Sequence, residues 1–107
     1  MTSMAILTAA VAAGCAVDTP AAPADDPQLV LGQEIYQANC ASCHGSEGQG
    51  GIGWKLNDGQ ALERYPDPAD EAAVVADGRS GMPAFGAKLS AEEIDAVVAY
   101  TREVLGS

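Results

Sequence analysis

The sequence is poor in positive charge, in aromatic residues and in cysteine. It has 107 residues, with 5 Lys and Arg against 15 Asp and Glu, and a formal net charge of -10. The lack of a basic cluster argues against a nucleic-acid partner. The acidic balance favours solubility and predicts protein partners with basic docking patches. A chain of this length has room for one domain.

One Trp, three Tyr and one Phe give the domain few large side chains for a core. A buried planar cofactor would supply the missing apolar centre, so the composition permits one without proving it. Alternating apolar patterns long enough for a sheet are also missing. These absences favour a small domain built from helices.

The N-terminal residues are predicted to lie outside the folded domain. Residues 4–13 form a short apolar run that looks like the core of a secretory signal, although no Lys or Arg precedes it. The run ends in AAGC at residues 12–15, which resembles the lipobox of bacterial lipoproteins with Ala12 in place of the usual Leu. The resemblance implies cleavage after residue 14 and membrane attachment through a lipidated Cys15. An ordinary secretory signal with a chance Cys is the alternative.

This interpretation divides the chain into a signal-like segment at 1–14, a tether at 15–27 and a folded domain at 28–107. The tether holds three of the six prolines, mixed with Ala and Asp, and cannot build a core. We expect the protein to be exported, in the periplasm or at the cell surface.

Capping signals predict an all-α domain of three to four helices. An Asp-Pro pair opens helices expected over 27–39 and 68–77, and a Gly follows the second one. A Ser-x-x-Glu capping box starts another helix, whose apolar residues keep helical spacing over 91–105. A short helix is expected around 61–64.

The residues that carry chemistry are Cys40, Cys43 and His44, in the sequence CASCH. Two thiols at this spacing can both reach the vinyl groups on one edge of a haem, and the His that follows can ligate the iron. The spacing therefore predicts one covalently attached haem c. Two of the three cysteines are used in this way, which leaves Cys15 without a disulfide partner.

Three alternatives fit the motif less well. A thioredoxin-like pair needs a preceding strand, and a helix is expected there. A structural zinc site needs four ligands, and the chain has a single His. A disulfide between Cys40 and Cys43 would leave the adjacent His44 unexplained.

Met82 is the candidate for the second axial ligand of the iron. No other Met follows residue 4, and Gly81 and Pro83 place this one in a loop. A Met is more often a gap-filler in a core, but the position between Gly and Pro is poor for that role. His and Met ligands raise the reduction potential and suit electron transfer better than oxygen chemistry.

From Leu29 to Leu105 the sequence resembles the class I mono-haem cytochromes c. The haem motif, Met82-Pro83, and the small and aromatic residues of the first and last helices carry the resemblance. It implies that these two helices cross at Gly32, Tyr36 and Tyr100. It also implies that His44 and Met82 ligate the iron.

The sequence departs from the family at Trp54, where a Pro usually follows the glycine-rich loop and accepts the N–H of the proximal His. Any backbone carbonyl can accept this bond, so we expect it to survive, with its acceptor segment open. Four residues are candidates for contacts to the haem propionates, and are equally plausible as ordinary core or surface residues: Trp54, Lys55, Tyr65 and Arg79.

Three functions agree with these residues. The first is a carrier, monomeric and not an enzyme, that moves single electrons between respiratory proteins at a small transient interface. The second is the haem-bearing subunit of a larger oxidoreductase complex. The third is a haem sensor or peroxidase-like protein in which Met82 does not bind iron.

Overall fold

The computed structural model describes residues 18–107, and these form a helical domain. The elements are α1 (Pro27–Asn39), α2 (Ala41–His44), α3 (Gln60–Arg64), α4 (Pro68–Asp77), α5 (Ala91–Tyr100) and a final π-helical turn η1 (Thr101–Leu105). Within the described residues there is no strand, and one isolated bridge joins Arg79 to Met82. The all-α prediction is confirmed. The signal segment and Cys15 lie outside the described residues.

The helices begin where the capping signals predict. The Asp26 side chain accepts from the backbone N–H of Leu29, and that of Asp67 accepts from Ala69. At α5, Ser90 and Glu93 exchange both bonds of a capping box. Each bond satisfies a backbone donor that has no partner within its helix, which fixes the start of the helix.

The helix predicted over residues 91–105 is α-helical only as far as Tyr100. It continues to Leu105, but its final turn is π-helical. The Thr101 hydroxyl lies 2.9 Å from the Val98 carbonyl oxygen and bonds to it, so a side chain competes for a helix acceptor at this point. Such a competing bond is a physical reason for the wider turn.

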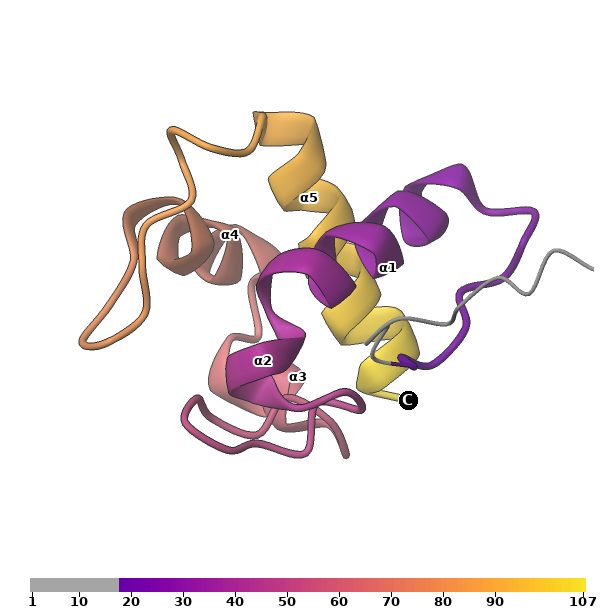
Figure 1. Cartoon of the computed structure of the whole chain (residues 1–107), viewed down its shortest axis with the longest axis horizontal. Coiled ribbons are helices and arrows are strands. Elements are labelled where there is room, and N and C mark those ends of the chain that lie inside the picture. Colours follow the sequence, from indigo (N-terminus) through magenta and orange to yellow (C-terminus); the bar gives the residue numbers. More distant parts are fainter. Residues whose placement is uncertain (1–17) are drawn as a thin grey trace, which may run out of the picture.

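Helices α1 and α5 cross at the centre of the domain (Figure 1). A Cβ atom on Gly32 would lie 2.2 Å from the Ala96 carbonyl oxygen and 2.7 Å from the Tyr100 Cβ. The rings of Tyr36 and Tyr100 pack with centroids 5.5 Å apart, and both side chains are fully buried. The crossing implied by the family resemblance is therefore present, and it needs a Gly at its closest point.

The hydrophobic core extends from this crossing to the connection between α4 and α5. Phe85 and Leu89, both in that connection, are buried in the same cluster as the aromatic pair. The backbone N–H groups of Phe85 and Gly86 donate to the carbonyls of Val75 and Ala76 on α4. Beyond Phe85 the connection is thus fixed to α4.

The end of the predicted tether contacts the folded domain. The Tyr100 hydroxyl donates to the Pro20 carbonyl at 2.6 Å. The Gln33 side chain accepts from the Ala22 backbone N–H at 2.8 Å and donates to the Thr19 hydroxyl at 3.3 Å. In Figure 1 this segment runs beside the C-terminal part of α5 before it enters α1. Among the described residues, none of the helices is long and apolar enough to cross a membrane.

Candidate functional site

The CASCH motif lies where α1 ends and α2 forms a single turn. The backbone N–H of Cys40 donates to the Tyr36 carbonyl, and Cys40 then caps α2. The N–H groups of Cys43 and His44 donate back to the Cys40 carbonyl at 3.2 and 3.0 Å. The two thiols and the imidazole are thus held within one helical turn at the end of a well-packed helix.

Both thiols are free and half-buried. Burial, together with the neighbouring Cys43, raises the pKa of the Cys40 thiol to about 12. A thiol with this pKa stays protonated at neutral pH, so free Cys40 is not an activated redox nucleophile.

The glycine-rich loop after α2 wraps around its end. The backbone N–H groups of Gly50 and Gly53 donate to the carbonyls of His44 and Cys43, both at 2.7 Å. A Cβ atom on Gly53 would lie 2.8 Å from the imidazole of His44. The loop was recognisable in the sequence, but the specific contact between Gly53 and the imidazole was not.

The imidazole of His44 is oriented by the backbone of Trp54. Its Nδ1 lies 2.7 Å from the Trp54 carbonyl oxygen. A carbonyl can only accept, so Nδ1 carries the proton, and in the neutral imidazole Nε2 then has the lone pair. The bond expected at the position of the family's Pro is confirmed, with Trp54 as the acceptor. The ring nitrogen that remains available is the one that an axial His needs.

Met82 lies in the connection between α4 and α5, as expected. The side chain is half-buried, and it packs, like Cys40, against the central hydrophobic cluster. Its backbone N–H and carbonyl both bond to Arg79, at 2.6 and 3.1 Å. Gly81 adopts a φ of 79°, a conformation that favours Gly and closes this tight turn.

The four candidates for propionate contacts have protein partners. Lys55 forms an ion pair with Asp58 at 2.9 Å. The guanidinium of Arg64 lies over the ring of Trp54. Arg79 donates to the Tyr65 hydroxyl at 3.1 Å, which brings two of the candidates together.

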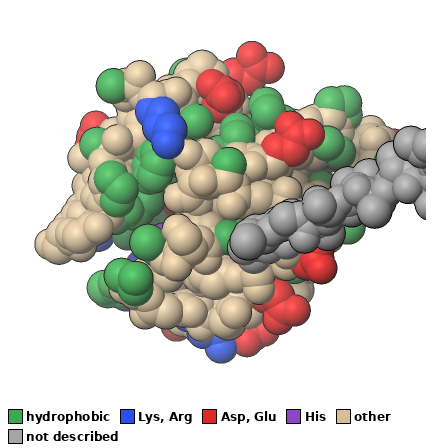
Figure 2. Space-filling view, in the orientation of Figure 1, with side chains coloured by type: hydrophobic (Ala, Val, Ile, Leu, Met, Phe, Trp, Pro, Cys, Tyr) green, Lys and Arg blue, Asp and Glu red, His purple; other side chains and the backbone are tan. Residues whose placement is uncertain are grey.

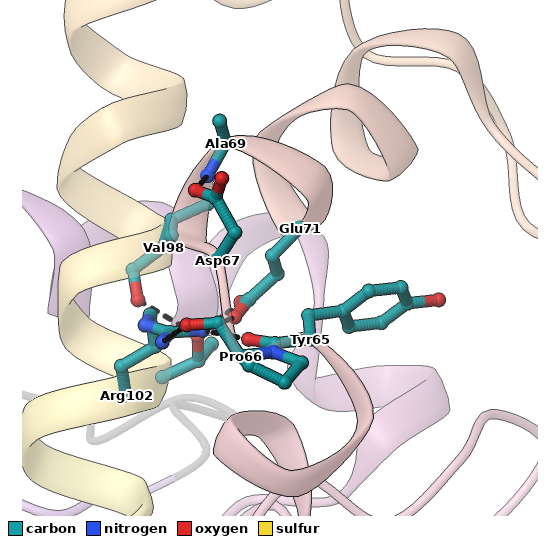
Figure 3. A network of polar contacts seen from close by, with 8 residues as sticks. Tyr65, Pro66, Asp67, Ala69, Glu71, Val98 and Arg102 are labelled. Atoms are coloured by element: carbon teal, nitrogen blue, oxygen red, sulfur yellow. Dashed lines mark hydrogen bonds and ion pairs between the residues drawn. The ribbon is translucent and has the colours of Figure 1, made fainter.

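A buried polar network that sequence reasoning missed joins α4 to the C-terminal turn (Figure 3). Glu71 is 6% exposed and accepts from Arg102 at 3.3 Å and from Thr101 at 2.5 Å. Arg102 also donates to the backbone carbonyls of Tyr65 and Pro66, at 2.6 and 3.0 Å. The segment between α3 and α4 is therefore fixed to the C-terminal turn.

The protonation of Glu71 follows from its surroundings. Burial raises its pKa, while the bonds to Thr101 and Arg102 act against that shift. The Thr101 hydroxyl has one proton but faces two acceptor groups, Glu71 and the Val98 carbonyl. The hydroxyl proton is therefore shared between these two acceptors, and burial remains the largest influence on the pKa of Glu71.

Comparison with known proteins places the chain in a family. Residues 27–100 match the family described as cytochrome c oxidase, cbb3-type, subunit III. The subunit FixP of the cbb3-type oxidase of Azorhizobium caulinodans is 42% identical over 80% of this chain, which spans 30% of that protein. Cytochrome c6 of a Synechococcus strain is 36% identical over 78% of this chain and 74% of its own length.

A solved structure agrees with these matches. Cytochrome c6 of the diatom Phaeodactylum tricornutum superposes with a TM-score of 0.59 and 37% identity, over 68% of this chain and 88% of that one. The residues matched by the family, 27–100, include the CASCH motif and Met82. The chain therefore belongs to the cytochrome c family, with its small class I mono-haem members as relatives, and its cofactor is covalently bound haem c.

Proposed function

We propose that the haem c is attached through Cys40 and Cys43 and that His44 and Met82 are its axial ligands. The bond from His44 Nδ1 to the Trp54 carbonyl supports this proposal most directly, because it leaves Nε2 free beside the two thiols. A bound haem c stores one electron at its iron. The chain contributes two thiols for attachment, an oriented imidazole and a thioether.

Met82 determines which chemistry the site performs. If both the His44 imidazole and the Met82 thioether bind the iron, no position would be left for small ligands such as oxygen. Sulfur ligation also raises the reduction potential. The protein then exchanges electrons without binding a substrate, and it needs no catalytic acid or base.

The experiment is co-expression with haem-attachment machinery, followed by mass measurement and spectroscopy in both redox states. We expect the mass of one haem on the purified chain and a low-spin spectrum that CO leaves unchanged. Cys40→Ser and Cys43→Ser should each lose one attachment bond, whereas Ser42→Ala, between them, should keep both. Met82→Ala should give a high-spin iron that binds CO.

A different result would support the sensor or peroxidase-like alternative. In that case the wild-type iron would already be high-spin and bind CO, and Met82→Ala would change neither property. Loss of covalent haem from the wild-type chain would contradict the attachment proposal itself.

We further propose that the protein is a mobile carrier rather than an enzyme. Its similarity to cytochromes c6 over most of their length supports this role. The second candidate is a haem-bearing subunit, which the match to subunit III of cbb3-type oxidases favours. Purification from native membranes without crosslinker separates the two, because a subunit co-purifies with an oxidase and a carrier does not.

We also propose a cellular location for the protein. The signal-like segment supports export to the periplasm or cell surface, and Cys15 supports attachment by lipid. Mass measurement of membrane and soluble fractions tests both. A Cys15→Ser variant should lose the lipid mass and move to the soluble fraction, and an unmodified wild-type Cys15 would contradict the anchor.

The acidic charge supports redox partners with basic patches. Among the described residues, acids are found on α1, α4 and α5, whereas residues 78–90 carry Arg79 and Lys88 and no acid. Figure 2 shows acidic side chains over α1 and α5 and fewer of them beside the connection that leads into α5. Electrostatic steering by the acids should make the association rate fall with increasing salt.

A further inference from the structure

Tyr65 connects two distant parts of the domain. It follows α3, and its backbone carbonyl accepts from Arg102 in the C-terminal turn at 2.6 Å. Its hydroxyl accepts from Arg79, in the connection between α4 and α5, at 3.1 Å. In Figure 3 the ring of Tyr65 extends away from Arg102, so the two bonds leave the residue on opposite sides.

The bond between Tyr65 and the C-terminal turn is firmly held. The Arg102 side chain is 12% exposed and is paired with the buried Glu71. It also bonds to the carbonyls of Tyr65 and Pro66. Charged donors in partly buried sites make stronger hydrogen bonds than neutral donors at the surface. Tyr65 thus has a fixed backbone from which its hydroxyl can position another group.

The second bond of Tyr65, to Arg79, reaches the turn that contains Met82. Arg79 and Met82 share two backbone bonds, so the position of one largely determines that of the other. The backbone bonds from this connection to α4 begin at Phe85, after the turn. Among the described residues, the bond from Arg79 to Tyr65 is the one hydrogen bond that joins residues 79–84 to another part of the fold.

We infer that Tyr65 and Arg79 are positioning residues that hold Met82 in place as an iron ligand. The inference rests on the ligation proposed above. Opening of the Met82 turn is needed before an external ligand can take the position of the thioether. An external ligand therefore binds with an apparent affinity proportional to the population of the open turn. Removing the bond between Arg79 and Tyr65 should raise that population.

The test is a titration of the oxidised holoprotein with imidazole. The readout is the weak far-red absorption band that a methionine–iron(III) bond produces, which disappears as imidazole replaces the thioether. Tyr65→Phe removes the hydroxyl but leaves the carbonyl bond to Arg102. We expect it to raise the apparent imidazole affinity about fivefold, which corresponds to about 1 kcal/mol, the typical net value of one hydrogen bond.

Two further variants separate positioning from charge. Arg79→Gln should raise the affinity by a similar factor, and the double variant should add little, because both changes remove the same bond. Lys88→Gln is the matched control: it removes a positive charge from the same connection, where Lys88 lies over the Phe85 ring. We expect this control to bind imidazole as the wild type does.

Three outcomes would contradict the inference. An unchanged imidazole affinity in Tyr65→Phe shows that the bond does not hold the turn. Equal effects of Arg79→Gln and Lys88→Gln show that charge alone acts. Absence of the far-red band from the wild type shows that Met82 is not a ligand, so the proposed ligation fails and this inference fails with it. The band therefore distinguishes failure of the two proposals.

Discussion

Gly32 is the point at which the two crossing helices leave no room for a side chain. Gly32→Ala would place a Cβ atom 2.2 Å from the Ala96 backbone oxygen, which cannot move without shifting α5. Overpacking of this kind costs about 1–3 kcal/mol. We expect a loss of that size in the free energy of unfolding of the holoprotein, measured with denaturant.

The control for this variant is Ala38→Gly, at an exposed position on the same helix. It should cost about 1 kcal/mol through helix propensity alone, without affecting the crossing. A stability of Gly32→Ala equal to or above that of the wild type would show that the helices can separate at no cost.

Glu71 should make stability depend on pH. Burial raises its pKa in the folded state, so the protonated form favours folding. The stabilisation by protonated Glu71 is fully present below the pKa of the carboxyl in the unfolded chain, about 4.3. It is lost as the pH rises through the higher pKa of the carboxyl in the folded protein. Glu71→Gln cannot titrate. The difference in free energy of unfolding, wild type minus variant, should therefore fall as the pH rises above about 4.3.

Glu92→Gln, on the exposed first turn of α5, is the control. The fall with rising pH should be absent from this control. Parallel profiles for Glu71→Gln would mean that burial does not raise the pKa of Glu71 in the folded protein.

At this scale, sequence reasoning succeeds where the chemistry is local. The backbone hydrogen bond to His44 was predictable, because any backbone carbonyl can accept it, but the structure was needed to identify Trp54 as the acceptor. The pair of Glu71 and Arg102 was not, because 31 positions separate the two residues and each one resembles a surface charge in the sequence. Only the packing of α4 against α5 brings them together.

The starts of the helices are decided by single hydrogen bonds. The Glu93 carboxylate accepts from the backbone N–H of Ser90 at 2.9 Å, while the neighbouring Glu92 lies in the same turn. Glu93→Ala should therefore lower the free energy of unfolding by about 1 kcal/mol, as loss of a cap typically does. Glu92→Ala should cost a few tenths, from the helix dipole alone. Equal losses measured by thermal unfolding would contradict a role for the capping box.

The helices were predictable because caps and apolar spacing are encoded within each segment. The π-helical end of the last helix was not, because it coincides with Thr101, whose hydroxyl bonds to both Val98 and Glu71. One of those partners comes from α4, so no signal within residues 91–105 reveals the change.

At the scale of the whole molecule, residues 19–22, which precede α1, form hydrogen bonds with both crossing helices. Tyr100→Phe removes the bond to the Pro20 carbonyl. We expect faster hydrogen exchange at the Ala22 amide and a loss of about 1 kcal/mol in stability. Tyr36→Phe is the matched control, because its hydroxyl bonds to Gly45 instead. Exchange at Ala22 that is equally fast in wild type and Tyr100→Phe would show that this bond does not hold the segment.

Composition predicted a Pro- and Ala-rich tether, and nothing in it signalled contact with the domain. Two of the three bonds use main-chain groups of the segment, the Pro20 carbonyl and the Ala22 amide, which meet side chains from α5 and α1; the third uses the Thr19 hydroxyl. Backbone groups carry no sequence signature. The docking of such a segment is visible only when the fold brings those side chains to it.

This docking limits how far the domain can move from a membrane. Within the described residues, the contact with the domain that lies nearest to Cys15 in the sequence is at Thr19, which bonds to Gln33. With Cys15 lipidated as we propose, the four residue-to-residue steps from Cys15 to Thr19 span at most about 14 Å when fully extended. The haem domain would stay close to the bilayer surface, with the side of α1 and α5 that contacts residues 19–22 toward the lipid. Electron exchange would then favour partners embedded in the same membrane over partners in free solution.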